Sequence, residues 1–245
     1  TLLKWVAEQA SNSDGISGKV NRVWDVQKND FAIGRFGWKA GQPTLMQQNA
    51  AAFNGDVGLT SNLFPNENCT TKQKICQELP NGGQPEVSDN ILNFVEFYTQ
   101  HLAVPIRRNT AEPLVKQGQN LFNQMGCQTC HKTNVKTASS TERPALSEQV
   151  IHPYTDMLLH DMGDGLADNR PEYLATGREW RTPPLWGLGY TEEVNGHTYF
   201  LHDGRARSVM EAVLWHGGEA EVAKQNVLKL NASEREALLA FLNSL

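Results

Sequence analysis

Long apolar runs are missing from this 245-residue sequence, and no stretch approaches the ~20 apolar residues that a membrane-spanning helix needs. Basic stripes are also missing, and the formal net charge of −5 argues against a nucleic-acid binder. No basic leader with an apolar core follows Thr1, so we expect a processed or truncated product. Hydrophobic residues make up 39% and charged residues 20%, which is typical of a globular protein with one or two cores.

Cysteine is scarce, and two of the four cysteines stand in Cys127-Gln128-Thr129-Cys130-His131. Two thiols three residues apart, followed at once by an imidazole, form the pattern that attaches a c-type haem. Each thiol adds to one haem vinyl group, and the histidine then becomes the proximal iron ligand. A thioredoxin-like dithiol expects a βαβ context and a zinc site expects a further Cys or His pair, and neither is present. We therefore predict one covalent haem c on Cys127, Cys130 and His131.

Covalent haem c is attached outside the cytoplasm, so the motif predicts a periplasmic or outer-surface protein. A membrane anchor in a missing N-terminus is an open alternative. In an oxidising compartment we expect Cys69 and Cys76 to form a disulfide across a short polar loop, with two free thiols as the alternative. The turn at Asp14-Gly15 lacks the regular acidic ligands of a calcium loop, which leaves Ca²⁺ as an unsupported second cofactor.

Helical spacing of apolar residues recurs along the chain, whereas strand alternation of any length does not. The long section Thr133–Tyr199 is rich in Pro, Gly and Asp, and loops of this length can wrap a cofactor. Gly118 would allow another helix to approach the helix before the haem motif. We therefore predict an all-α fold in which that helix crosses the C-terminal helix, as in a cytochrome c domain. The expected helices are 1–10, 43–53, 89–102, 114–124, 208–215 and a last one that begins at Asn231 or Ser233.

The residues alone leave several candidates for the sixth ligand of the iron. His202 and His216 are the strongest, because they flank one short helix after the haem motif. The Gly217-Gly218 pair beside His216 would let the backbone pass close to a porphyrin. Any of these histidines could instead be a hydrogen-bonded structural residue. The other candidates are His101, His152, His160, His197, Met157 and Met162.

Five segments together are typical of a known family. They are EWRTPPLWG at 179–187, LHDGRA at 201–206, LWHGGEA at 214–220, GRFGWKA at 34–40 and YTDMLLHDMG at 154–163. In these segments the chain resembles the di-haem oxidoreductases of the thiol-oxidoreductase-like group, which are related to bacterial di-haem cytochrome c peroxidases and MauG. The resemblance covers nearly the whole chain.

The resemblance implies two haem domains, each with its own Cys-x-x-Cys-His motif, whereas this sequence contains one such motif. Residues 1–110 would be the later part of a first, peroxidatic haem domain, and residues 111–245 would be a cytochrome c domain. A faint internal repeat fits this division, because Phe36 precedes Met46 as Phe200 precedes Met210. The chain would then be the C-terminal portion of a longer protein, and a second haem is expected only in the longer form.

For the haem on the motif, the resemblance places His216 at the distal-ligand position opposite His131. Bis-histidine ligation would lower the reduction potential relative to a haem with a methionine ligand. His202 would be a structural histidine near the haem, and Arg181 would belong to the same haem-binding set.

For the peroxidatic side, the resemblance implies three further residues. Trp38 would stand between the two haems as an electron relay, and Gln48 would lie above the peroxidatic haem. Asp56 lies near the family's catalytic glutamate, where a carboxylate would move a peroxide proton, but its spacing differs by two residues. The alternatives are an ordinary core aromatic for Trp38 and a residue of a helix-ending turn for Asp56.

These expectations together predict the electron-transfer domain of a periplasmic di-haem peroxidase-like oxidoreductase. A small redox protein or a quinol-linked donor would supply electrons, which would pass through Trp38 towards the second haem. The chain alone would carry electrons and would not turn over peroxide. The alternatives are a stand-alone monohaem electron-transfer module and a binding or sensing domain that uses its haem structurally.

Overall fold

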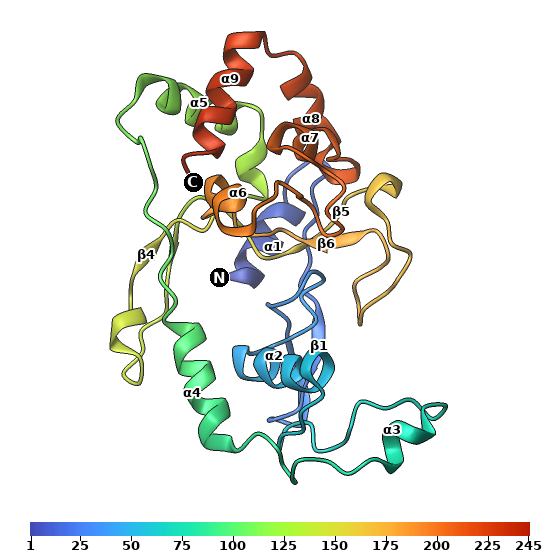
Figure 1. Cartoon of the computed structure of the whole chain (residues 1–245). Helices are drawn as coiled ribbons and strands as arrows, with labels where there is room; N and C mark the ends of the chain where they lie inside the picture. The colour runs from blue at the N-terminus through green and yellow to red at the C-terminus, as the bar shows by residue number, and fades with distance from the viewer. The chain divides into compact units, whose positions relative to one another are not determined.

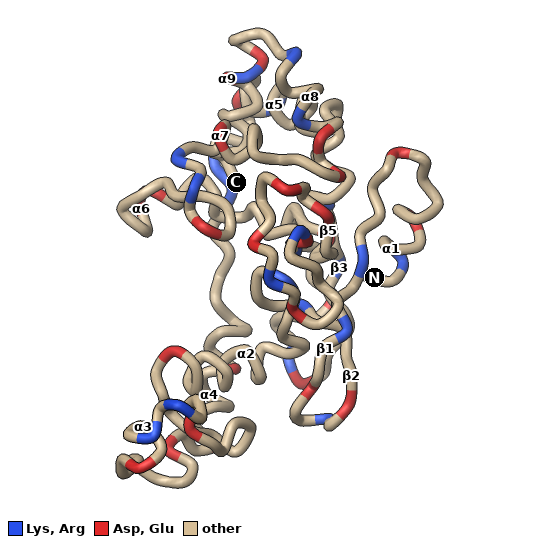
Figure 2. The backbone as a smooth tube through the Cα atoms, turned by 90° about the vertical axis from the view of Figure 1, so that its right-hand side faces the viewer, with Lys and Arg blue, Asp and Glu red and all other residues tan.

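A computed structural model describes residues 1–245, and the chain divides into two compact units (Figure 1). Unit 1 comprises residues 1–20 and 103–245 and contains the haem motif. Unit 2 comprises residues 21–102. Unit 1 is therefore built from two separate stretches of sequence. None of the helices combines the length and the hydrophobicity that a membrane span requires. Acidic and basic residues are interspersed along the backbone (Figure 2), in keeping with the modest net charge of −5.

Two helices frame the core of unit 1, α5 (Pro113–Gln124) and α9 (Ala232–Leu242). Proline at the first position suits the start of α5, and a capping box between Asn231 and Glu234 starts α9. The helices cross at Gly118, where an added Cβ would overlap the carbonyl oxygen of Ala237. The expected close approach at Gly118 is therefore confirmed. The shared core contains Val115, Leu121, Phe122, Tyr154, Ala237, Leu238, Phe241 and Leu242.

Short elements surround this frame. The helices are α1 (Leu2–Ala10), α6 (Thr191–Asn195), α7 (Val209–Leu214) and α8 (Glu221–Leu228). The strands are β3 (Val135–Lys136), β4 (Val150–Ile151), β5 (Leu159–Asp161) and β6 (Glu179–Arg181). They form two antiparallel pairs, β3 with β4 and β5 with β6, and the second pair sets His160 opposite Trp180.

Unit 2 contains a hairpin and three helices. The hairpin joins β1 (Arg22–Asp25) to β2 (Asp30–Ile33), and the helices are α2 (Leu45–Ala52), α3 (Lys74–Glu78) and α4 (Asp89–Gln100). Side-chain caps from Thr44 and Ser88 start α2 and α4. A small core holds α2 and α4 together through Met46, Ala50, Val87 and Leu92.

The prediction of an all-α fold is wrong. The chain is 39% helical and 11% strand, with three small antiparallel sheets and much loop, which makes it mixed α/β. Each strand has only two to four residues. Alternation of apolar and polar residues needs a longer run before it can be recognised, so these pairs left no periodic signal.

The internal repeat of the sequence recurs in the local structure. Phe36 pairs with Gln42 in an isolated antiparallel bridge, and Phe200 pairs with Ala206 in the same way. Two residues after each bridge, a side-chain cap starts a helix, from Thr44 for α2 and from Ser208 for α7. The two segments thus share a turn and a helix start as well as a spacing.

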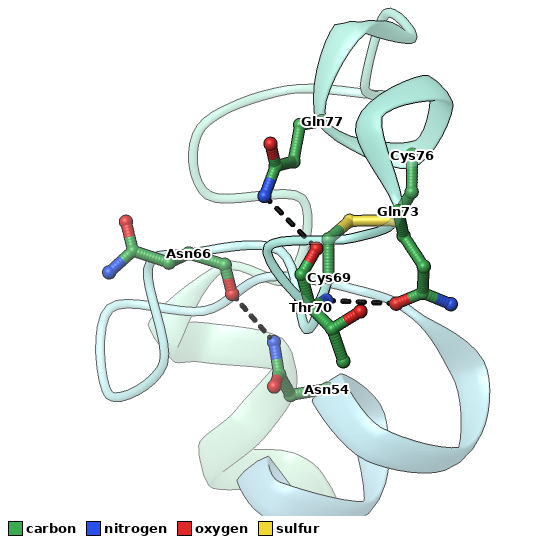
Figure 3. Close-up of a disulfide and its surroundings, with 7 residues drawn as sticks. All are labelled: Asn54, Asn66, Cys69, Thr70, Gln73, Cys76 and Gln77. Carbon is green, nitrogen blue, oxygen red and sulfur yellow. Dashed lines mark hydrogen bonds between the residues drawn. A yellow bond between two sulfur atoms is a disulfide. The ribbon is translucent and has the colours of Figure 1, made fainter.

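The expected bridge between Cys69 and Cys76 is confirmed as a disulfide (Figure 3). Two glutamines tie the loop to the short helix that follows it. The side chain of Gln73 accepts a hydrogen bond from the backbone N–H of Thr70 at 2.8 Å, and Gln77 donates to the Thr70 carbonyl at 3.1 Å. Few side chains of this loop are buried, so the covalent bond replaces packing there.

Candidate functional site

The haem motif begins where α5 ends. Gly126 adopts a left-handed conformation with φ of 92°, and a 3₁₀ turn over Cys127–Thr129 follows it. The N–H of His131 donates to the carbonyl of Cys127 at 3.0 Å, which closes the turn. Both motif thiols are free, and burial raises the pKa of the Cys127 thiol to about 12. Redox-active dithiols have lowered pKa values, so this environment argues against a thioredoxin-like role.

His131 is held from the core of unit 1. Its Nδ1 lies 2.9 Å from the carbonyl oxygen of Tyr154, whose ring packs edge-on against Phe122 and Phe241. A proton on Nδ1 makes this hydrogen bond, and the lone pair then remains on Nε2. Desolvation lowers the pKa of His131 to about 4, so the ring is neutral at pH 7. A neutral imidazole with its lone pair on Nε2 is the form that binds iron.

His216 has the same arrangement just after α7. Its Nδ1 lies 2.8 Å from the carbonyl oxygen of Ala212, which again leaves the lone pair on Nε2. Desolvation lowers the pKa of His216, and its charge is among the causes that lower the pKa of His131. The two rings are therefore close enough to influence each other. Two neutral imidazoles and two free thiols are the donor set of a bis-histidine haem c, so these residues fit the group.

The glycines beside His216 have a packing role. Gly218 has φ of 54°, and an added Cβ would overlap the carbonyl oxygen of Asp161. A Cβ on Gly217 would lie 3.0 Å from the carbonyl oxygen of Met162. The segment after His216 thus lies directly against the backbone at the end of β5. The two glycines are therefore explained by close contact between two backbone segments of the protein. The sequence had suggested close contact with a porphyrin instead.

The structure removes His160 from the candidate iron ligands. Its Nδ1 lies 2.7 Å from Glu219, and its Nε2 lies 2.9 Å from Asp156. Both ring nitrogens are thus engaged, and neither can also bind iron. The ring also lies beside Cys130, with Nδ1 3.8 Å from the sulfur. Cys130, Asp156 and His160 could hold a metal ion by their spacing, but the predicted haem attachment would use the same cysteine.

Other predicted haem-site residues lie around β6. The ring of His202 stacks on Trp180 at 3.6 Å between centroids, and its Nε2 lies 3.8 Å from Asp203. Arg181 is partly buried, which lowers its pKa, and it donates to the carbonyl of Thr182 at 3.4 Å. The stacking of His202 is in keeping with a structural histidine.

The three residues expected on the peroxidatic side all belong to unit 2. Trp38 is 53% exposed, so it is not an ordinary core aromatic. The Oε1 atom of Gln48 is buried and has no hydrogen-bond partner. Buried polar atoms in proteins are normally hydrogen-bonded, so this oxygen would be satisfied by a polar partner outside the described chain. Asp56 is exposed in a π-helical turn, Phe53–Val57, that ends at the left-handed Gly58.

Sequence reasoning missed the polar cluster around His160. Asp156 and Glu219 both lie inside segments that carry the family resemblance, so a signal for them was present. Gln9 gave no such signal, yet its buried amide donates to Asp156 at 2.9 Å and to the carbonyl of Thr129 at 3.2 Å. The N-terminal helix α1 thus contributes to the surroundings of the haem motif.

Comparison with known protein families supports the resemblance. No curated protein matches the sequence. A family model described as "Di-haem oxidoreductase, putative peroxidase" matches residues 1–245, which confirms the resemblance found in the sequence. Because the match spans the whole chain, the protein belongs to the di-haem oxidoreductase family.

Proposed function

We propose that this chain is the haem c electron-transfer part of a periplasmic di-haem peroxidase-like oxidoreductase. The observation that carries the proposal is the pair His131 and His216, two neutral imidazoles that each keep Nε2 available. A haem c bound between them would supply a one-electron iron couple of low potential. If His131 and His216 both held the haem iron, peroxide would find no open site on it, which favours electron transfer over peroxide turnover.

The residues of this chain have separate tasks in the proposed site. Cys127 and Cys130 would hold the haem covalently, so that it would stay bound in either oxidation state. The carbonyls of Tyr154 and Ala212 orient the two imidazoles through hydrogen bonds to Nδ1. Apolar side chains packed against the core exclude water from this region, among them Leu185, Met210 and Val213.

Unit 2 would carry electrons onwards to a second haem that is held by a longer form of the protein. Trp38 would be the relay, and its exposure supports contact with a group outside the core of unit 2. Gln48 would lie above the second haem, which the orphaned Oε1 atom supports. Asp56 would be the proton-transferring carboxylate, and its exposed turn leaves it accessible to a substrate.

A comparison of α4 with α9 supports this reading of unit 2. Counted from their capping residues Ser88 and Asn231, the two helices have apolar residues at matching positions. In and just after α9 these positions are 0–3% exposed and belong to the core shared with α5, whereas in and just after α4 they are 54–74% exposed. By analogy with α9, the exposed apolar face of α4 would pack against a helix that plays the part of α5, the helix that leads into a haem motif. The matching residues are Phe94, Tyr98 and Leu102 in unit 2, and Ala237, Phe241 and Leu245 in unit 1.

The proposed periplasmic location and the proposed partners follow from the same chemistry. Covalent haem attachment takes place outside the cytoplasm, and a disulfide such as Cys69–Cys76 persists in an oxidising compartment. Electrons would come from a small redox protein or a quinol-linked donor.

The test is to produce the chain in cells that attach haem c and to measure its intact mass and optical spectrum. We expect the polypeptide mass plus one haem and a low-spin spectrum in both oxidation states. Bare polypeptide in material that matured properly would overturn the proposal. A wild-type protein that binds carbon monoxide rapidly would favour the alternative of a haem-based binding or sensing module.

A further inference from the structure

His160 lies at the centre of a buried polar cluster. Its side chain is 3% exposed and donates to two carboxylates on opposite sides of the ring, Asp156 at 2.9 Å and Glu219 at 2.7 Å. A ring that donates through both nitrogens carries a positive charge. Charge-assisted hydrogen bonds of this kind are stronger than neutral ones, and they are stronger still where water is excluded.

Each carboxylate connects the ring to other segments. Asp156 also accepts from the side chain of Gln9 at 2.9 Å, and Gln9 in turn donates to the carbonyl of Thr129 inside the haem motif. Glu219 also accepts from the backbone N–H groups of Ser17 at 2.9 Å and Asp161 at 3.2 Å. The cluster therefore ties the haem attachment turn to the segment that contains Glu219.

Glu219 follows the proposed distal ligand, His216, by three residues. On its N-terminal side His216 is held by α7, through the carbonyl of Ala212. On its C-terminal side stand two glycines, which by themselves leave the backbone free to move. The bonds of Glu219 are the polar contacts that hold this C-terminal side against β5 and His160.

We propose that His160 is a positioning residue that, through Glu219, fixes the distal-ligand segment relative to the haem attachment turn and so keeps His216 on the iron. This inference rests on the proposed function, because it takes His216 as the distal ligand. When the pair between His160 and Glu219 is broken, the glycine-containing segment gains freedom. The ligand then dissociates more often, and the iron spends more time five-coordinate.

The experiment compares carbon monoxide binding, spin state and reduction potential in variants of the haem-loaded protein. Glu219→Gln removes the charge that faces His160 and keeps one oxygen, which at the Oε1 position can still accept from the backbone N–H of Asp161, while the bond from the N–H of Ser17 is lost. His160→Gln removes the ring. Glu221→Gln is the matched control, because it makes the same change two residues later, at a partly exposed ion pair with Lys224.

We expect Glu219→Gln and His160→Gln to bind carbon monoxide roughly tenfold faster than the wild type, within the range found for coupled neighbours. Both variants should also gain a high-spin fraction and shift the potential, and Glu221→Gln should match the wild type. The double variant should equal the stronger single one, because both changes break the same pair. If His160→Gln fails to mature, Glu219→Gln and the control still decide the matter.

Urea unfolding of the same variants separates positioning from general stability. Wild-type binding rates, spectra and potential in both Glu219→Gln and His160→Gln would overturn the proposal, even if the two variants unfold more easily. Failure of the proposed function looks different. In that case His216→Ala would itself remain low-spin and closed to carbon monoxide.

Discussion

Gly118 of α5 lies directly against the carbonyl oxygen of Ala237 in α9. This contact joins the helix that leads into the haem motif to the C-terminal helix. A side chain at position 118 would meet backbone, which cannot rotate away as a flexible side chain could. The spacing between the two helices is therefore set by the absence of a Cβ.

Gly118→Ala should destabilise unit 1 by about 3 kcal/mol, the upper end of the usual cost of overpacking, because the helices must separate. Urea unfolding followed by circular dichroism measures the change. Gln117→Ala, on the exposed side of the same helix, is the control and should change the free energy of unfolding by less than about 0.5 kcal/mol. Equal effects of the two substitutions would contradict the crossing geometry.

His216→Ala should open the sixth position of the iron and convert the low-spin spectrum to a high-spin one that shifts with cyanide or carbon monoxide. His202→Ala is the matched comparison. Because His202 stacks on Trp180, we expect its loss to leave the haem low-spin. An unchanged spectrum in His216→Ala would assign the iron to another ligand. A band near ~695 nm in the wild-type protein would indicate Met157 or Met162 as the ligand instead.

The stabilising effect of His160 should depend on pH. Burial by itself would lower the pKa of His160, but hydrogen bonds to Asp156, Cys130 and Glu219 outweigh burial and raise it to about 12. An unfolded histidine loses its proton near pH ~6.5. The stabilisation is therefore complete below that pH and declines as the pH rises towards the folded-state value.

The difference in unfolding free energy between wild type and His160→Gln should thus shrink from pH 6 to pH 9, by up to ~1.4 kcal/mol per pH unit. Urea unfolding at three pH values measures it. In the haem-loaded protein Cys130 is a neutral thioether, so only the two carboxylates raise the pKa of His160. The free-energy difference should therefore change by less than this amount per pH unit. A difference that grows with pH would have the wrong sign for a charged ring.

The disulfide should stabilise unit 2 through the unfolded chain. The bridge spans seven positions, and closing such a short loop contributes about 2.4 kcal/mol in the chain-entropy description. Replacing both Cys69 and Cys76 by Ser should lower the stability of unit 2 by up to that amount and leave the haem spectrum unchanged. Peptide mapping without reductant should find the two cysteines linked, and free alkylatable thiols at both positions would contradict the bridge.

Features that depend on neighbours in sequence could be predicted well. The haem motif is five consecutive residues, and α9 carries its start signal in Asn231 and Glu234. The disulfide followed from two nearby cysteines and an oxidising compartment. The helix crossing at Gly118 could be expected because glycine inside an apolar helix face has few other uses.

Features that depend on distant residues could not be predicted. The pairing of β5 with β6 involves three residues on each strand, with seventeen residues between the two strands, so no periodic pattern marks it. His160 looked like any other histidine, because the carboxylate of Glu219 reaches it from 59 positions away. Gln9 is an ordinary polar residue of a short helix until Asp156 is placed beside it.

The division of unit 1 into residues 1–20 and 103–245 has a consequence for the order of folding. The partners of Gln9 lie 120 and 147 positions further along the chain, so α1 leaves the ribosome long before they exist. At typical rates of synthesis the delay is roughly 7–30 s. Unit 2 is complete within that interval and can fold first, because it is a compact unit made of one continuous stretch of sequence. Closing the long loop from α1 to the haem motif is then a late and slow step of folding. Loss of the α1 contacts should therefore slow the assembly of the haem site and leave the stability of unit 2 unchanged.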